Sequence, residues 1–369
     1  MSYTSSPDAA GAGRTDVPVL ALAVLSGICG LGYEVLLARG LPLILGHTTA
    51  VSSATIATFL GALALGALAA HRLEPRLPWV EGAAAAIAAV YAAVFAIGPV
   101  AVQAALGGVS VAGATVWAIV FAAPPAFVAG AAIPAYSLRG GAAAGSGRTP
   151  AFTRVYFLYN LLAAIAILGI DTAAVPAFGL AACFGVLAVI NAGVALLMRR
   201  AARPEPGALV LREDTRPAGP AVAVVAAMGV AGGMAQVGTI VYAHLSYGML
   251  AGHAAYTVAL ALIGLSLGVV ASRVGRYRPG AVLGGLSVAA AAGLLLAGPS
   301  LGAWASGVGA LTAAWQAVAL KAACLAMVVL PLFTAVGASI PLVAARWPGG
   351  PETPGRLLAV AAAGNAVGA

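Results

Sequence analysis

The sequence predicts an all-α protein that crosses a membrane many times. Hydrophobic residues make up 62% of the chain and charged residues only 8%, whereas soluble domains are about 25% charged. The mean hydropathy is +1.04. The apolar residues come in runs of roughly 20, the length that a helix needs to cross the hydrocarbon core of a bilayer. Together these observations exclude a soluble globular domain.

Charged and Pro/Gly-rich interruptions divide the chain into candidate spans. The residues from 355 to the end rise only about 22 Å as a helix, less than the hydrocarbon core of about 30 Å, so the eleventh span is expected to be incomplete. Residues 99–111 are apolar but Gly-rich, and are expected as a loop or as an extension of the next helix. The spans expected are 17–40, 50–71, 79–98, 112–138, 152–170, 175–198, 221–246, 253–272, 280–298, 312–343 and a start at 355.

Two polar stretches define the expected domain organisation. Residues 1–16 are small and polar, which predicts a disordered N-terminal tail. Residues 199–220 form the most polar segment of the chain and are predicted as a cytoplasmic linker. The linker would separate an N-terminal six-helix half, 17–198, from a C-terminal half, 221–369, that is truncated in its last helix.

The two halves share short patterns in the same order, which predicts an internal duplication. Each match alone is weak, because chance similarity is common in Ala/Gly-rich helices. Prolines in matched helices permit kinks, which transporters use in bendable gates, so several matched positions are structural or gating candidates. The matches are Gly66/Gly268, Arg72/Arg273, Pro124/Pro331, Gly130/Gly337, Pro134/Pro341, Arg139/Arg346 and Gly46-His47/Gly252-His253.

The basic residues fall almost entirely on one predicted side of the membrane. If the N-terminus is cytoplasmic, that side receives nearly all of the arginines, and only Arg39 and Lys321 lie elsewhere. This asymmetry follows the positive-inside rule and predicts a multi-pass protein of the bacterial inner membrane with a cytoplasmic N-terminus. The net charge of +8 is therefore a topology signal, and we expect the lipid bilayer rather than nucleic acid as the partner.

Several segments together carry a family resemblance. They are Tyr33-Glu34-Val35 with Arg39, Leu45-Gly46-His47-Thr48, Phe59-Leu60-Gly61, Pro124-Pro125, Gly130 to Pro134, Arg154-Val155-Tyr156 with Asn160, and Gly355-Arg356-Leu357. They resemble the membrane region of the fused major-facilitator-like/spermidine synthase family. The resemblance implies a bundle of two six-helix repeats, of which about eleven spans are present, and a secondary transporter for polyamines or other small amines.

The basic turn after the eighth expected helix also resembles the loop signature of the major facilitator superfamily. Ser272 stands where that signature has an Asp, and His71 stands there in the first half. In the superfamily this Asp latches neighbouring helices, so its replacement in both halves puts the usual gating arrangement in doubt.

Charged residues inside the spans are the candidate site, because a charge in the bilayer is costly without a partner or a task. In the implied arrangement, Glu34 of the first helix and Lys321 of the tenth face one another across a central cavity as substrate or coupling groups. The alternative is that Glu34 pairs locally with Arg39 and that Lys321 snorkels outward. Gln236 stands where Glu34 stands when the halves are aligned, although ordinary interhelical amide bonding also explains it. Asp171 is expected as a boundary residue.

No enzyme, cofactor or metal site is expected. An aminopropyltransferase domain needs a soluble α/β segment with a Gly-rich turn, and no soluble stretch exceeds 199–220. The three cysteines are scattered and the four histidines lack metal-ligand spacing. Two other functions stay open: a non-transporting membrane module that anchors or partners a separate spermidine-synthase-like enzyme, and a fragment of such a fused enzyme. The sequence does not identify the small-molecule substrate.

Overall fold

The structure is a bundle of long helices. The computed structural model describes residues 17–46, 49–106, 110–143, 148–200, 219–247, 253–274, 278, 280–289, 291–292, 295, 307, 314–346 and 353–369. The expected tail and nearly all of the expected linker lie outside the described residues, and so do residues 290, 293–294 and 296–298 of the ninth expected span. The helix α7 continues to Arg200 and α8 begins at Gly219, so helix extends into both ends of the segment predicted as a linker.

The helices fall into two groups along the chain. The N-terminal group consists of α1 (Val17–Leu45), α2 (Thr49–Leu73), η2 (Glu74–Arg76), α3 (Leu77–Ile97), α4 (Pro99–Ala105), α5 (Val111–Ala143), α6 (Arg148–Gly169), η3 (Ile170–Ala174) and α7 (Val175–Arg200). The described part of the C-terminal group includes α8 (Gly219–Tyr247), α9 (His253–Val274), a shorter apolar helix (Gly280–Ala289), α11 (Ala314–Arg346) and α12 (Thr353–Gly368).

The described helices agree with the expected spans in type and approximate position. Within the described residues, seven helical runs are long and apolar enough to cross a membrane. Two of these, Ala50–Ile97 and Ala151–Arg200, each contain two successive helices. Residues 99–111 hold a separate short helix, α4, so they are neither wholly loop nor an extension of α5. The helices α6 and α7 are joined through a π-helical turn, η3, and α7 is broken at Gly179, whose φ is 79°.

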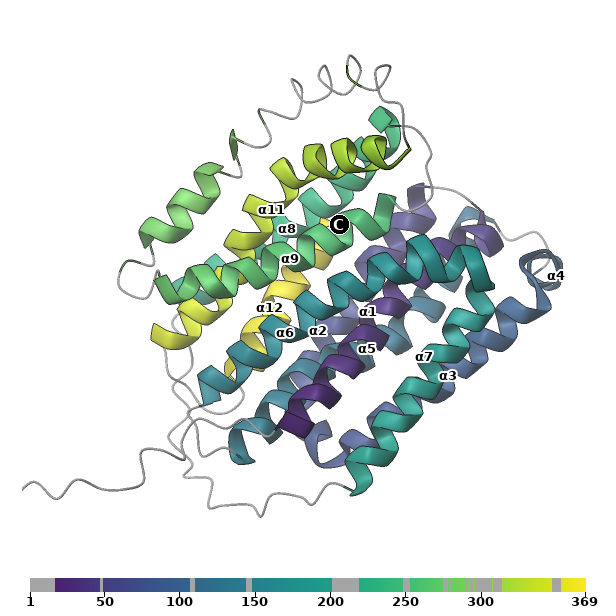
Figure 1. Cartoon of the computed structure of the whole chain (residues 1–369), viewed down its shortest axis with the longest axis horizontal. Helices are drawn as coiled ribbons and strands as arrows, with labels where there is room; N and C mark the ends of the chain where they lie inside the picture. Colours follow the sequence, from purple (N-terminus) through teal and green to yellow (C-terminus); the bar gives the residue numbers. More distant parts are fainter. Residues whose placement is uncertain are drawn as a thin grey trace, which may run out of the picture.

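Each group has its own internal packing, and two seams join the groups. In the N-terminal group α2 packs on α5, α3 packs on α7, and α1 contacts α5, α6 and α7. In the C-terminal group α9 packs on α11, and α8 contacts α11 and α12. The seams are formed by α2 with α12 and by α6 with α9; Figure 1 shows the green to yellow helices beside the purple to teal ones.

The hydrophobic core follows the same division. One cluster joins both groups and includes Tyr156 of α6, Leu262 of α9 and Leu357 of α12. A second cluster lies within the N-terminal group, around Leu36 of α1 and Phe184 of α7. The two groups are thus held together by apolar contacts along the seams, while the far part of the N-terminal group has a core of its own.

Arginines gather at one end of the bundle, which we call the basic end. It is the end at which α1, α3, α6 and α12 begin and α2, α5 and α7 finish. The side chain of Arg199 there lies over the ring of Trp79, 4.4 Å from its centroid. The arginines near this end include Arg72, Arg76, Arg139, Arg154, Arg199 and Arg356.

Candidate functional site

A hydrogen bond between Glu34 and Gln236 joins the two groups of helices. The amide of Gln236 on α8 donates to the carboxyl group of Glu34 on α1. Glu34 is 9% exposed and Gln236 is 5% exposed. Glu34 lies 17 residues after Val17 and Gln236 lies 17 residues after Gly219, which puts each about 25 Å along its helix at 1.5 Å per residue. The sequence alignment of the halves paired these two positions, and the fold brings their side chains into contact.

Lys321, the other charged residue expected in the centre, lies on α11 and is only 4% exposed. Its expected position opposite Glu34 stays a prediction. Thr239, one turn beyond Gln236 on α8, is also buried, at 5% exposure. Glu34 in the N-terminal group and Gln236, Thr239 and Lys321 in the C-terminal group are therefore all buried polar residues.

The alternative in which Glu34 pairs with Arg39 is wrong. A guanidinium nitrogen of Arg39 lies 2.8 Å from a carboxylate oxygen of Asp171 and 3.1 Å from the backbone carbonyl of the same residue. Asp171 lies in η3, at the boundary between α6 and α7, and is buried, at 4% exposure. From this π-helical turn, its backbone carbonyl and one of its carboxylate oxygens accept from Arg39 of α1.

A second buried carboxyl group, Glu81, is absent from the site predicted by the sequence. It lies on α3, is 0% exposed, and accepts hydrogen bonds from the Tyr136 hydroxyl at 2.9 Å and from the Asn191 amide at 2.7 Å. Ser26 of α1 is a third partner, and Tyr33 donates to the Asn191 carbonyl oxygen at 2.9 Å. The sequence does place this acidic residue inside an apolar run. It was not selected as a site residue because it lies near the start of the predicted span 79–98, where a charged residue is ordinary.

The matched glycines lie where helices approach most closely. A Cβ atom added at Gly66 of α2 would overlap the backbone of α5 at Phe127, and one at Gly130 of α5 would overlap the backbone of α2. In the C-terminal group, Gly268 of α9 meets α11 at Thr334 in the same way, and Gly337 of α11 meets α9. In both helix pairs, α2 with α5 and α9 with α11, a glycine of each helix therefore lies against the backbone of the other helix.

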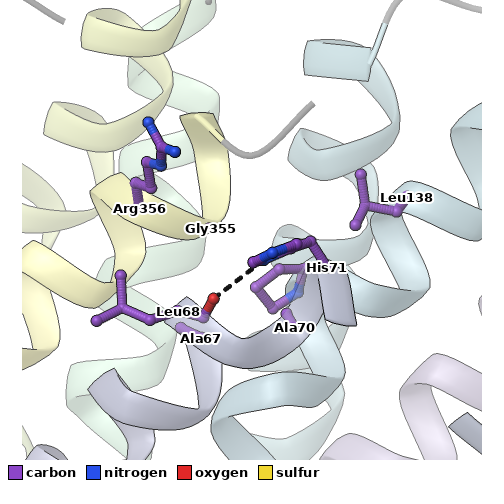
Figure 2. A pocket seen from close by; sticks show the side chains of 8 residues that line it. Ala67, Leu68, Ala70, His71, Leu138, Gly355 and Arg356 are labelled. Atoms are coloured by element: carbon purple, nitrogen blue, oxygen red, sulfur yellow. Dashed lines mark hydrogen bonds between the residues drawn. The ribbon is translucent and has the colours of Figure 1, made fainter. Parts of the chain in front are cut away.

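A cavity of about 190 Å³ opens at the basic end between α2, α5 and α12. Figure 2 shows His71 of α2, Leu138 of α5 and Arg356 of α12 around it, with the imidazole of His71 hydrogen-bonded to the Leu68 carbonyl at 3.2 Å. Ser272, at the corresponding place on α9, likewise bonds a carbonyl three residues earlier in its own helix, at 2.7 Å. The two residues that replace the signature Asp thus make these bonds within their own helices.

The remaining gating candidates lie mainly towards the basic end. Arg139 is buried, at 4% exposure, whereas Arg72 and Arg273 are exposed and Arg346 ends α11. Pro134 lines the cavity beside Gly355, and Pro341 lies inside α11. Both α5 and α11 continue as helices through these prolines. Within the described part of the chain, no group of three or more His, Cys, Asp or Glu side chains has the arrangement of a metal site.

The comparisons with known proteins give a fold but no family. No family model matches the chain, and no curated protein sequence matches it. Among solved structures, the crystal structure of the nucleoside transporter NupG is similar, with a TM-score of 0.50 and 12% sequence identity over 95% of this chain and 89% of that one. At this identity the likeness shows the fold alone. The protein is a polytopic membrane protein, helical throughout nearly all of its described residues, with a fold similar to that of this transporter.

This result supports the expected resemblance only in part. The transporter-like fold agrees with the major-facilitator-like membrane region that the sequence resembles. No comparison supports the spermidine synthase part of that family, and none supports a polyamine as the substrate.

Proposed function

We propose that the protein is a secondary transporter and that Glu34 and Gln236 bind its substrate or coupling ion. The hydrogen bond between these two residues is the observation that carries the proposal, because it joins the two groups of helices far from either end of α1 and α8. Transporters that work by rocking one half against the other bind their substrate between the halves, near the middle of the membrane. Lys321 on α11 is the third member of this site.

Matching contacts in the two groups support an arrangement of two six-helix halves, 17–198 and 221–369, joined by a cytoplasmic linker. If α1, α2, α5 and α6 correspond to α8, α9, α11 and α12, the contact of α2 with α5 corresponds to that of α9 with α11. The contacts of α1 with α5 and α6 then correspond to those of α8 with α11 and α12. The seam of α2 with α12 corresponds to that of α9 with α6. Such a correspondence is what an internal duplication produces.

The basic end is proposed to face the cytoplasm of a bacterium, with the protein in its inner membrane. The gathering of arginines there, against Arg39 at the far end of α1, supports this orientation through the positive-inside rule. Green fluorescent protein fused to the N-terminus should fluoresce in cells, whereas alkaline phosphatase fused there should be inactive. The opposite pair of results would overturn the orientation.

Small cationic amines, including polyamines, are the substrate class proposed first. The carboxylate of Glu34 and the amide oxygen of Gln236 both accept hydrogen bonds, as the N–H groups of an ammonium ion require. Because a nucleoside transporter has a similar fold, a nucleoside is tested in the same assay as the alternative substrate.

Uptake into proteoliposomes tests the proposal. Purified protein is reconstituted and supplied with radiolabelled spermidine, putrescine or uridine, and wild type is compared with Glu34→Gln. The matched control is Glu74→Gln, the same chemical change in η2, outside the long helices. Saturable uptake that is lost in Glu34→Gln and retained in the control supports the proposal. Uptake that survives Glu34→Gln unchanged would falsify the role of Glu34.

The proposal separates the protein from the other functions that the sequence leaves open. A membrane module that anchors a spermidine-synthase-like enzyme needs no substrate path between its halves. For such a module, reconstituted protein would show no saturable uptake of any probe, and Glu34→Gln would leave binding of the enzyme intact.

A further inference from the structure

Glu81 is a buried carboxyl group that the proposed transport site does not use. Four helices of the N-terminal group meet at it: α3 carries Glu81, α5 gives Tyr136, α7 gives Asn191 and α1 gives Ser26. The Tyr136 hydroxyl and the Asn191 amide each bind a different oxygen of the carboxyl group, at 2.9 and 2.7 Å. The side chain is 0% exposed, so it has no direct contact with solvent in this state.

Every hydrogen-bond partner of Glu81 in the described part of the chain is electrically neutral. Its partners are the hydroxyls of Ser26 and Tyr136 and the amide of Asn191. Arg39, by contrast, is paired with Asp171. A buried carboxylate without a cation carries a large desolvation cost, and binding a proton removes that cost. The chemistry of the site is thus suited to a proton.

The network can satisfy the carboxyl group in both protonation states. Ser26 and Tyr136 also hydrogen-bond each other, and a hydroxyl can donate or accept. With a proton on Glu81, its O–H can donate to Tyr136, which can turn its own O–H to Ser26. The Glu81 carboxyl group and the Tyr136 hydroxyl therefore each keep a partner in both states.

The other titratable groups that face Glu81 do not exchange protons near neutral pH in water. They are Cys29 and Tyr33 of α1, Tyr136 of α5 and Tyr159 of α6. Thiols and phenols lose their protons only in alkaline solution. A carboxyl group, by contrast, is ionised in neutral water, and burial without a cation favours its protonated form, so Glu81 is the group in this network whose charge can change during a physiological cycle.

The helix α1 connects the hydrogen bonds around Glu81 to the hydrogen-bonded pair of Glu34 and Gln236, which we call the central pair. Tyr33 bonds Asn191, which bonds Glu81, whereas the next residue, Glu34, bonds Gln236 of α8. A rotation or shift of α1 would therefore change both sets of contacts at once. From this geometry we infer that Glu81 binds and releases the proton that drives transport, a role that rests on the proposed function. The proton is taken from water on one side of the membrane and returned to water on the other, and no other bond is made or broken.

Two measurements on purified protein test the inference, and the first needs no substrate. Infrared difference spectra between acidic and alkaline buffer should contain the band of a protonated carboxyl group. Glu81→Gln should lose that band, and Glu34→Gln should retain it. Tyr136→Phe keeps the carboxyl group but removes one partner, so the pH midpoint of the band should shift. A band that is unchanged in Glu81→Gln would overturn the inference.

The second measurement uses spermidine and uridine in proteoliposomes. Uptake driven by an acidic outer solution should fall about tenfold in Glu81→Gln, whereas counterflow exchange without a pH gradient should continue. Glu34→Gln should lose both modes, which distinguishes failure of the substrate site from failure of proton coupling. Wild-type uptake that ignores the pH gradient would overturn the inference even if the infrared band behaves as expected. No uptake in either mode would overturn the proposed function and the coupling role with it.

If Glu81→Gln does not fold, Glu81→Asp takes its place. It retains a titratable group at the same position, so the carboxyl band should remain with a shifted midpoint and gradient-driven uptake should persist. Loss of gradient-driven uptake with an unshifted band would overturn the inference.

Discussion

In the N-terminal group, Gly66 and Gly130 let α2 and α5 approach until backbone meets backbone, and in the C-terminal group Gly268 and Gly337 do the same for α9 and α11. The two groups differ in their charges. Glu34, Glu81 and Asp171 all lie in the N-terminal group, and the sequence has no Asp or Glu between Asp214 and Glu352. The close approach of helices explains the glycines in both groups. Helix packing does not explain the buried carboxylates, which the structure shows in the N-terminal group. The difference therefore points to the N-terminal group as the seat of the chemistry.

The largest expected effect tests the shared packing. Gly66→Leu and Gly268→Leu should each prevent the helices from packing correctly, because the added side chain would have to displace the backbone of the neighbouring helix. The free energy of unfolding should fall by about 3 kcal/mol or more. Size-exclusion chromatography of the detergent-solubilised protein would show loss of the monodisperse peak in both. Gly193→Ala, whose Cβ atom would meet nothing within 4 Å, is the control. If only one of the two leucine variants fails, the packing of the groups is not equivalent.

The next effect tests the asymmetry of charge. Glu34→Gln removes a charged hydrogen-bond acceptor from the central pair, so substrate affinity should fall by about 1.5–3 kcal/mol, or ten- to hundredfold. The double variant Glu34→Gln/Gln236→Glu restores a carboxylate to the pair from the other group, and should recover part of the uptake. Proteoliposome uptake measures both. An unrecovered double variant would mean that the carboxylate must lie on α1.

A smaller effect tests the ion pair between Arg39 and Asp171, which joins α1 to η3. Asp171→Asn leaves Arg39 without its anion, and stability should fall by about 1–3 kcal/mol, at the lower end because the Arg39 side chain is 30% exposed. Thermal unfolding in detergent measures the loss. Thr172→Ala, at the exposed neighbouring position, is the control. The apolar pair Arg39→Met/Asp171→Leu should regain stability, and a further loss in that variant would contradict the prediction.

The smallest effect contrasts packing within a group with packing at a seam. Gly61 of α2 faces α12, where a Cβ atom would lie 3.8 Å from that of Ala366, an ordinary contact. Gly61→Ala should therefore leave stability unchanged or raise it by up to about 1 kcal/mol through helix propensity. Differential scanning fluorimetry is sufficient to compare it with wild type. Marked destabilisation would show that the seam is as tight as the contact between α2 and α5.

Much of the fold was predictable because each spanning helix is a long apolar run with its own boundaries. The positions of α1, α2, α3 and α5 follow from such runs, and the matched glycines were visible from spacing alone. The extension of α1 through Pro42 and the separate helix α4 were not predicted. Proline and glycine mark possible breaks, but only the surrounding helices decide whether the chain breaks there.

The sequence predicted which residues form the candidate site better than it predicted which of them contact one another. Glu34 and Gln236 were selected because a polar residue in a bilayer needs a reason to be there, and their equivalent positions in the two halves linked them. The partner of Arg39 was not predictable, because Asp171 lies 132 residues away, in a π-helical turn. Glu81 was missed because its partners come from three other helices.

The sequence by itself determined that the protein is a helical membrane protein, where most helices lie, and which residues carry charge into the apolar region. Local composition and hydrogen bonding within each helix are sufficient for this, because lipid offers the backbone no other partner. Only the tertiary structure decided which charges meet. An ion pair or a hydrogen-bonded carboxyl group needs side chains from helices that are distant in sequence, and their rotation about each helix axis is fixed by packing.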